Sequence, residues 1–275
     1  MKRKRSVLLV AKHVFLLLVS IVFLLPFVII FLGAFKTGAE AKLMRLSLPG
    51  EVIWWDNFAK VIERGNLIRS FFNSALYSIC GTGGGVLLSA LAAFVLSRRR
   101  TSLNNAVYFF MIMGIVLPVN MAALIQAMKQ FALMGTQIGI ILLYIATTIP
   151  MALFIIYGFI ATVPRDLDEA ALIDGASPIR MFVFIVLPLL KPVLVTVSLL
   201  GFTGIWNDFQ TPLYVLNTTK YWPMTLAIYN FFGMYENDWN YIFADIVLTC
   251  LPAIIVYLIG QKQIISGLMS GAVKG

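Results

Sequence analysis

Six long apolar stretches alternate with short polar ones along the chain, and this alternation predicts its elements. The stretches cover about 14–35, 71–97, 105–126, 138–161, 193–216 and 241–262. Each has roughly the 20 apolar residues that cross a bilayer as one helix. Because lipid offers the backbone no hydrogen-bond partners, we expect an all-α integral membrane protein with six transmembrane helices. Pro118 and Pro150 predict broken or kinked helices in the third and fourth spans, which either line a pathway and bend or are static kinks.

Composition and charge support this organisation. With 60% hydrophobic residues, 12% charged residues and a mean hydropathy of +0.92, the chain carries more apolar surface than a soluble protein of 275 residues could bury. With the N-terminus inside, the inner segments hold 13 of the 21 Lys and Arg residues and the outer segments hold 8. We therefore expect a multi-pass protein with both termini cytoplasmic: an N-terminal segment 1–13, a membrane domain 14–262 and a tail 263–275. The net charge of +9 follows from this topology, and no soluble basic face for nucleic acid is present.

The segment 164–192 is the one long region between spans that is both charged and amphipathic. Asp166 and Glu169 have the D-x-x-E spacing of a capping box, which predicts that a helix begins there. Four residues recur at i, i+3, i+4 and i+7, which predicts that they share one face: Leu167, Ala170, Ala171 and Asp174. The two alanines make that face nearly smooth, so it suits close contact with another protein.

The sequence also predicts where the helix that begins at Asp166 ends. Gly175 can take the left-handed conformation that ends a helix. Ser177 followed by Pro178 predicts the N-cap and first residue of a second short helix. Asp174 lies at the end where a negative charge opposes the helix dipole by about 0.3–1 kcal/mol. An acid kept there indicates a cationic partner outside the chain.

The same segment resembles the EAA loop of bacterial ABC-importer permeases. In that loop E-A-A is followed after three residues by G, and after nine more by I-x-L-P; the matching residues are Glu169, Ala170, Ala171, Gly175, Ile185, Leu187 and Pro188. The resemblance implies a type I ABC importer permease fold, in which a cytoplasmic coupling helix fits a cleft on the ATP-hydrolysing subunit. It assigns ATPase coupling to Glu169, Ala170, Ala171 and Gly175, and we add Asp174 on the charge argument.

Further motifs are similar to carbohydrate permeases of the maltose-type system, in particular its shorter six-span subunit. They are Trp206-Asn207-Asp208-Phe209, Pro212-Leu213, Trp239, Leu251-Pro252 and Gly271–Gly275, with departures at Gln210-Thr211 and Asp245. The likeness implies a second homologous permease chain, two ATP-binding cassette subunits that bind ATP and Mg, an extracellular or periplasmic solute-binding protein, and membrane lipid as partners. It also implies a bacterial cytoplasmic membrane location and no cofactor in this chain. In that family an outer loop, here 217–240, reaches the binding protein; Tyr229, Tyr235 and Trp239 are the candidate contacts, although membrane-interface anchoring uses the same residues.

Asn207 and Asp208 are candidates for the solute pathway, because ionisable groups at membrane depth are costly and usually face a cavity or a partner. Asp208 lies about 24 Å along its helix from the inner end, at 1.5 Å per residue. Two roles are open for it: a polar wall of the pathway, or a structural acid satisfied by Asn207, Thr211 or backbone amides. Pro212 opens the helix nearby.

The glycine-rich run 81–85 is not a phosphate-binding loop, because no Lys follows it as the Walker A motif requires. Gly81 and Gly85 instead have the G-x-x-x-G spacing that lets two helices approach closely. Without a Walker A motif the chain is not expected to hydrolyse ATP. The single His and the two Cys form no ligand set, so no catalytic or metal site is predicted.

These observations predict a transmembrane permease subunit of an ATP-driven, binding-protein-dependent sugar or oligosaccharide importer. The alternatives are a permease for a non-sugar solute such as a glycerophosphate, an ion-coupled secondary transporter, and a membrane scaffold without transport. A secondary transporter would normally carry midplane acids and a recognisable pair of repeats. The amphipathic segment with its alanine face favours the importer, because such a surface can receive force from a soluble partner.

Overall fold

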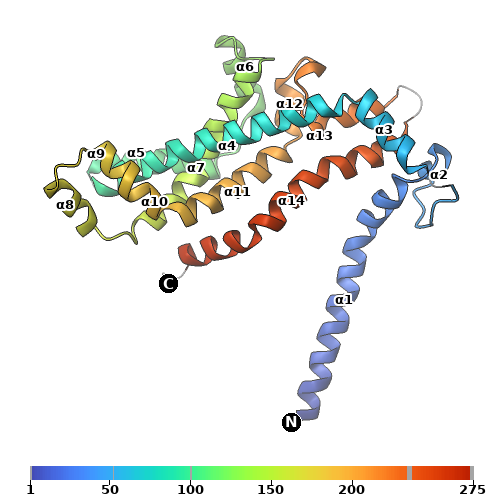
Figure 1. Ribbon diagram of the computed structural model, residues 1–275, viewed down its shortest axis with the longest axis horizontal. Helices are drawn as coiled ribbons and strands as arrows, with labels where there is room; N and C mark the ends of the chain where they lie inside the picture. The colour runs from blue at the N-terminus through green and yellow to red at the C-terminus, as the bar shows by residue number, and fades with distance from the viewer. Residues whose placement is uncertain (1, 52, 100, 234–236, 273–275) are drawn as a thin grey trace. The chain divides into compact units, whose positions relative to one another are not determined.

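The computed structural model describes residues 2–51, 53–99, 101–233 and 237–272, with side chains described except at 2–8, 54 and 263–272. Over these residues the chain is helical, and its only β-type pairing is an isolated bridge between Phe232 and Asn237 (Figure 1). The all-α fold class is therefore confirmed. The helices form two compact units, Met1–Leu67 with Ala227–Cys250, and Ile68–Leu226 with Leu251–Gly275.

A buried asparagine, Asn57, connects the helices of the first unit by hydrogen bonds. Its helices are α1 (Lys2–Gly33), α2 (Gly38–Lys42), α3 (Trp54–Arg64), the 3-10 turn Ile228–Phe231, and the first part of α14 (Trp239–Ala272). Asn57 of α3 donates from Nδ2 to the carbonyls of Ala34 and Lys36, each at 2.9 Å. Its Oδ1 accepts from Asn240 Nδ2 at 2.8 Å. This one side chain therefore ties the end of α1 to α3 and to the start of α14.

The helices of the second unit pack around α7 (Gln137–Ile160). It contains α4 (Leu67–Arg98), α5 (Ser102–Val116), α6 (Met121–Gln130), α7 (Gln137–Ile160), α8 (Asp166–Ile173), α9 (Pro178–Met181), the π-helical segment Phe182–Val186, α10 (Leu187–Leu189), α11 (Lys191–Trp206), α12 (Gln210–Val215), the 3-10 turn Thr219–Tyr221, and α13 (Met224–Ala227). Helix α7 packs against both α5 and α11. A buried cluster that includes Ala93, Leu153, Ile156, Val186 and Val193 joins α4, α7, the π-helical segment and α11.

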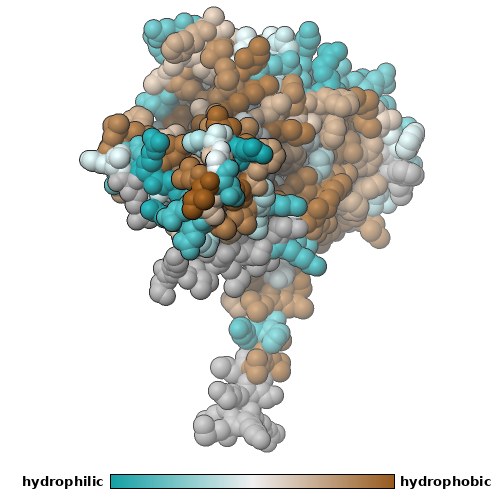
Figure 2. Space-filling model, turned by 60° about the vertical axis from the view of Figure 1, so that its left-hand side comes forward, coloured by the Kyte–Doolittle hydropathy of each residue, from teal (hydrophilic) through white to brown (hydrophobic). Residues whose placement is uncertain are grey.

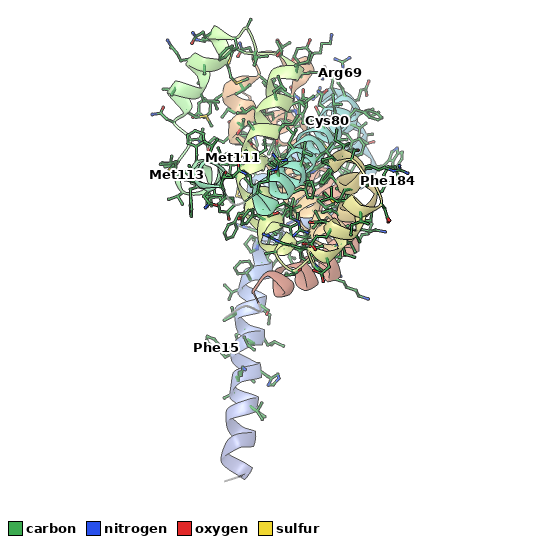
Figure 3. All side chains as sticks on the ribbon, turned by 90° about the vertical axis from the view of Figure 1, so that its left-hand side faces the viewer. Phe15, Arg69, Cys80, Met111, Met113 and Phe184 are labelled. Atoms are coloured by element: carbon green, nitrogen blue, oxygen red, sulfur yellow. The ribbon has the colours of Figure 1, made fainter. Side chains whose placement is uncertain are left out.

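Several helices are long and apolar enough to cross a membrane. Within the described residues there are four: Leu9–Gly33, Leu67–Arg98, Gln137–Ile160 and Trp239–Lys262. Two bent pairs raise the number to six if each pair is one span. Large apolar side chains such as Phe15, Met113 and Phe184 point away from the helices that carry them (Figure 3). Such surface is suited to lipid or to a partner helix rather than to water.

The third predicted span, 105–126, is not one helix. Helix α5 ends at Val116, α6 begins at Met121, and their axes differ by 119°. Leu117 is extended because the residue before a proline is excluded from the helical region. Asn120 then starts a new helix by accepting from the amide of Ala123 at 3.1 Å. Of the broken or kinked helix predicted from Pro118, the structure shows a sharp break.

The fifth predicted span, 193–216, is also interrupted. Helix α11 ends at Trp206 and α12 begins at Gln210. Pro212 has no amide hydrogen for the carbonyl of Asp208, four residues before it, and that carbonyl accepts from Thr225 Oγ1 at 2.9 Å instead. The opening predicted from Pro212 is confirmed, and it lies at Asn207–Phe209. Before α11, the chain bends by 77° between Pro178–Leu189 and Lys191–Trp206.

The glycine seam on α4 is confirmed as a packing surface. A Cβ built on Gly81 would lie 2.6 Å from Tyr144 Cβ, and one built on Gly85 would lie 2.6 Å from Thr148 Cβ. Real Cβ atoms do not approach so closely, so only glycine at these positions allows α4 to lie against α7 at this distance. The seam therefore fixes the position of the α7 face that carries Tyr144 and Thr148.

Candidate functional site

The first candidate site is the α8–α9 elbow, residues 166–181, which lies at one end of the second unit (Figure 1). Helix α8 begins at Asp166 as predicted, but the predicted capping box is wrong. The N-cap is Arg165, whose side chain makes no capping hydrogen bond in the described structure. Its carbonyl accepts from the amides of Asp168 and Glu169 at 2.8 and 3.1 Å. Three acids in the first turn suit the positive end of the helix dipole, so the helix begins there without a side-chain cap.

The other end of α8 is built as the sequence predicts. Gly175 has φ +76°, its amide donates to Leu172 O at 3.0 Å, and the Ala176 amide donates to Ala171 O at 2.9 Å. This pair of bonds is the Schellman motif that closes a helix through a left-handed glycine. Ser177 then caps α9 by accepting from the Arg180 amide at 3.3 Å. The turn between the two helices is therefore defined by local chemistry.

We expect Gly175→Ala to lower thermal stability through the backbone alone. Among the described atoms none lies within 4 Å of an added Cβ, so the cost is that of a left-handed alanine, about 1–2 kcal/mol. The thermal midpoint of the purified protein should fall by a few degrees. Gly158→Ala is the matched control: its Cβ also meets no described atom within 4 Å, and inside helix α7 alanine is favoured over glycine. Equal midpoints for the two variants would contradict the expectation.

The predicted smooth alanine face is only half right. Ala170 is exposed, whereas Ala171 is 4% exposed and packs in the buried cluster of the second unit. Asp168, three residues before Ala171, is buried on the same side, since residues three apart share a helix face. The outer surface of the elbow therefore keeps Leu167, Ala170 and Asp174 of the predicted face and adds Glu169 and Ile173. Figure 2 turns this end toward the viewer and shows hydrophilic side chains gathered among hydrophobic ones.

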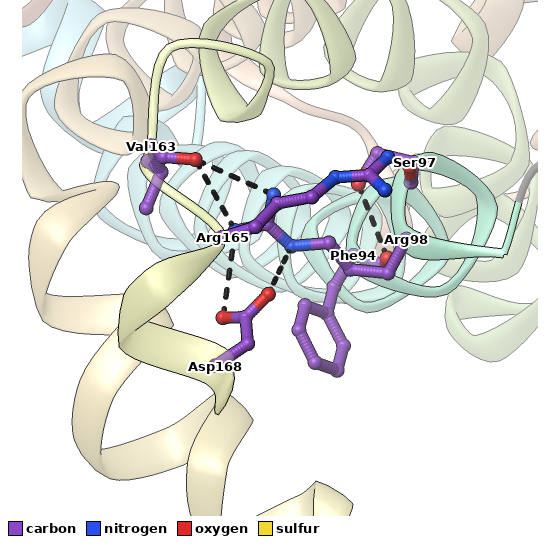
Figure 4. A network of polar contacts seen from close by, with 6 residues as sticks. All are labelled: Phe94, Ser97, Arg98, Val163, Arg165 and Asp168. Atoms are coloured by element: carbon purple, nitrogen blue, oxygen red, sulfur yellow. Dashed lines mark hydrogen bonds and ion pairs between the residues drawn. The ribbon is translucent and has the colours of Figure 1, made fainter. Parts of the chain in front are cut away.

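An ion pair joins the elbow to the end of α4 (Figure 4). Arg98 Nε lies 2.6 Å from Asp168 Oδ2, and the two side chains are 14% and 12% exposed. Arg98 also donates from Nη1 to Val163 O at 3.4 Å, and Arg165 donates from Nη2 to Ser97 O at 3.4 Å. Neither Arg98 nor Asp168 is marked by a sequence motif, and Arg98 is only one of the basic residues counted in the inner segments. The one available signal was the Asp directly before Glu169.

The second candidate site is a cavity of about 280 Å³ between α7 and α11. Its lining includes Tyr144, Thr147, Thr148, Leu200, Gly204 and Asp208. Tyr144 Oη donates to Asp208 Oδ2 at 3.1 Å, and the Thr211 amide donates to Asp208 Oδ1 at 3.2 Å. Asp208 therefore combines features of both roles left open for it: Thr211 satisfies one oxygen, and the side chain lines a cavity.

The remaining predicted site residues lie elsewhere. Asn207 is the exposed C-cap of α11 and is not among the residues that line the cavity. Tyr229 and Trp239 flank Phe232, with ring centroids 5.8 and 6.3 Å from it. Trp239 is the first residue of α14 rather than part of a loop. Tyr235 lies outside the described residues. The contact of these aromatics with a binding protein stays a prediction.

Comparison with known proteins identifies relatives over most of the chain. Residues 85–268 match the family described as binding-protein-dependent transport system inner membrane component. The diacetylchitobiose uptake system permease protein NgcG of Streptomyces coelicolor is 31% identical over 95% of this chain and 88% of its own length. The melibiose/raffinose/stachyose import permease protein MelC of Bacillus subtilis is 35% identical over 81% of this chain and 82% of its own.

The fold has a solved counterpart. A chain of a bacterial ABC transporter involved in the import of the acidic polysaccharide alginate superposes with a TM-score of 0.82 at 20% identity, covering 94% of this chain and 97% of that one. The resemblance to an ABC-importer permease and the type I permease fold are therefore confirmed. The chain is a multi-pass membrane protein, and it belongs to the family of binding-protein-dependent transport system inner membrane components.

Proposed function

We propose that the chain is the transmembrane permease subunit of an ATP-driven importer of sugars or oligosaccharides. The observation that carries this proposal is the α8–α9 elbow: Glu169 and Asp174 lie on its exposed side, while Asp168 and Ala171 fix its inner side to the second unit. Because the exposed side of the elbow is attached to the second unit through its buried inner side, it is suited to receive force from another protein. The names of the relatives, which include permeases for diacetylchitobiose and for raffinose, support a sugar as the solute.

In this proposal the chain forms half of the translocation pathway, and a second homologous permease chain forms the other half. Two ATP-binding cassette subunits bind ATP and Mg on the cytoplasmic side and close on each other. Each draws one elbow with it, which turns the pathway outward to receive solute from the extracellular or periplasmic binding protein. Hydrolysis in those subunits returns the inward-facing state. Both termini and the elbow then lie on the cytoplasmic side of a bacterial plasma membrane.

The charge of the elbow predicts the character of the partner surface. Asp166, Glu169 and Asp174 are all exposed and acidic. Asp174 gains nothing from its own helix, because it lies at the negative end of the dipole. A cleft with basic side chains would satisfy all three acids, and Leu172 and Ile173, 56% and 86% exposed, would pack against its apolar part.

Glu169→Lys tests the proposal. The reversed charge faces the cleft of the ATPase subunit, so we expect uptake to fall at least tenfold, or ATP hydrolysis to continue without uptake, while the amount of protein in the membrane is unchanged. Glu63→Lys on α3 makes the same charge change at an exposed position outside the elbow. For both variants, the measurements are uptake of radiolabelled sugar and ATP hydrolysis, in membranes that contain the whole transporter. Wild-type uptake for Glu169→Lys would remove the elbow from the mechanism.

A further inference from the structure

The lining of the cavity between α7 and α11 combines a few polar side chains with apolar ones. Tyr144, Thr147, Thr148 and Asp208 form the polar part, while Leu200, Ile205 and further aliphatic residues form the apolar part. Binding sites for small solutes commonly have this division, with a few convergent polar groups that fix orientation. At about 280 Å³ the cavity is slightly smaller than ordinary ligand pockets, which begin at about 300 Å³. It therefore suits a single ring rather than a whole oligosaccharide.

Asp208 retains hydrogen-bonding capacity toward the cavity. A carboxylate offers about four lone-pair sites on its two oxygens. Among the described residues, its side chain accepts two hydrogen bonds, from Tyr144 Oη and from the Thr211 amide. These two bonds hold the group in one orientation and leave acceptor sites for the hydroxyl groups of a ligand.

The charge of the lining restricts the ligand class. Asp208 is acidic, and the described residues that line the cavity include no Lys, Arg or His. An anionic ring would meet the carboxylate without any compensating cation, and desolvating it there would be costly. An uncharged ring with several hydroxyl donors matches both the carboxylate and the apolar walls.

We propose that this cavity is a subsite for one uncharged sugar ring of the passing solute, with Asp208 accepting from its hydroxyls and Tyr144 positioning that carboxylate. The inference rests on the proposed function and deepens it, because it assigns a solute contact to this chain and excludes acidic sugars from the contact. The subsite can fail while the importer function stands, because cavity variants and elbow variants give separate readouts.

A cysteine placed at Gly204 can report on the charge inside the cavity. It lines the cavity, and an added Cβ there meets no described atom within 4 Å. Gly204→Cys, made with Cys80→Ser and Cys250→Ser to remove the two exposed native thiols, can be treated in the assembled transporter with small cationic and anionic methanethiosulfonates. A cleft with one sign of charge raises the encounter rate of the opposite charge by about tenfold or more. We expect the cationic reagent to react about tenfold faster, and Asp208→Asn to remove the preference.

The control is Gly158→Cys on α7. Its Cβ also meets no described atom within 4 Å, and it does not line the cavity, so its reaction rates should not respond to Asp208→Asn. An unreactive Gly204→Cys would show that the space is filled by lipid or protein. A rate for the anionic reagent equal to or above the cationic one would show that the cavity is not electronegative. Either result overturns the subsite.

Uptake tests the ligand class. Gly204→Leu should fill the cavity and lower uptake of radiolabelled raffinose or diacetylchitobiose at least tenfold, while ATP hydrolysis stimulated by the loaded binding protein persists. Gly158→Leu should leave uptake unchanged. Normal uptake by Gly204→Leu would overturn the subsite but not the importer function. Preferential uptake of trigalacturonate by the wild type would overturn the restriction to uncharged sugars. A wild-type transporter that takes up none of these sugars, and whose ATP hydrolysis is not stimulated by a loaded binding protein, would overturn the proposed function itself.

Discussion

Asp168→Asn is expected to abolish most coupled uptake, although the residue lies on the inner side of the elbow. The substitution keeps the size of the side chain and one acceptor oxygen, but it removes the negative charge that neutralises Arg98. The Arg98 charge then stays largely buried, with the carbonyl of Val163 as its other described acceptor. Breaking a buried pair by removing one partner costs about 3–5 kcal/mol. The slight exposure of both side chains, 14% and 12%, places the cost at the lower end of that range. Helix α8 should then move without moving α4, so ATP hydrolysis should continue while uptake falls.

The measurement is the ratio of sugar taken up to ATP hydrolysed in reconstituted transporter, together with the thermal midpoint. Arg99→Gln is the matched control, because Arg99 is the exposed neighbour of Arg98. The charge-exchanged double variant, Arg98→Asp with Asp168→Arg, should recover part of the ratio, as contacting pairs show coupling of about 0.5–3 kcal/mol. A wild-type ratio for Asp168→Asn would show that the pair has no part in transmission. Recovery of stability without recovery of the ratio would limit the pair to holding the fold.

The elbow could be predicted from the sequence where its structure depends on neighbouring residues. Gly175 closes α8 through backbone groups three and five positions away, and Ser177 caps α9 through an amide three positions away. Such contacts are contained in the local sequence, so their residue types identify them. The membrane helices are predictable for a similar reason, since about 20 apolar residues suffice to indicate a span.

The contacts that give the candidate sites their chemistry could not be predicted in this way. Arg98 and Asp168 are 70 positions apart, and Tyr144 and Asp208 are 64 apart; nothing local to either member of a pair indicates the other. The burial of Ala171 rather than Ala170 depends on the cluster contributed by α4 and α7. The break after α5 needed two local signals together, since a proline alone permits a kink and only Asn120 begins a new helix.

Gly85→Ala is expected to destabilise the protein strongly, although the same substitution at a helix position without close neighbours stabilises a helix. Alanine is favoured over glycine inside helices by about 1 kcal/mol. At Gly85, however, the new Cβ would lie 2.6 Å from Thr148 Cβ and 3.1 Å from the backbone oxygen of Ile145. Overpacking of this kind costs about 1–3 kcal/mol, and α4 must move away from α7 to relieve it. Because Thr148 also lines the cavity, uptake should fall together with the thermal midpoint.

Gly83→Ala separates this effect from helix propensity. Gly83 is two residues away on the same helix, and no described atom lies within 4 Å of an added Cβ there, so its midpoint should equal or exceed that of the wild type. Combining Gly85→Ala with Thr148→Gly removes the Cβ and methyl group that the new side chain meets, and should restore part of the midpoint. The Ile145 oxygen remains in place, so recovery should be incomplete. If Gly85→Ala and Gly83→Ala melt together, α4 does not lie against α7 as closely as this seam requires, and the position of Tyr144 beside Asp208 loses its structural support.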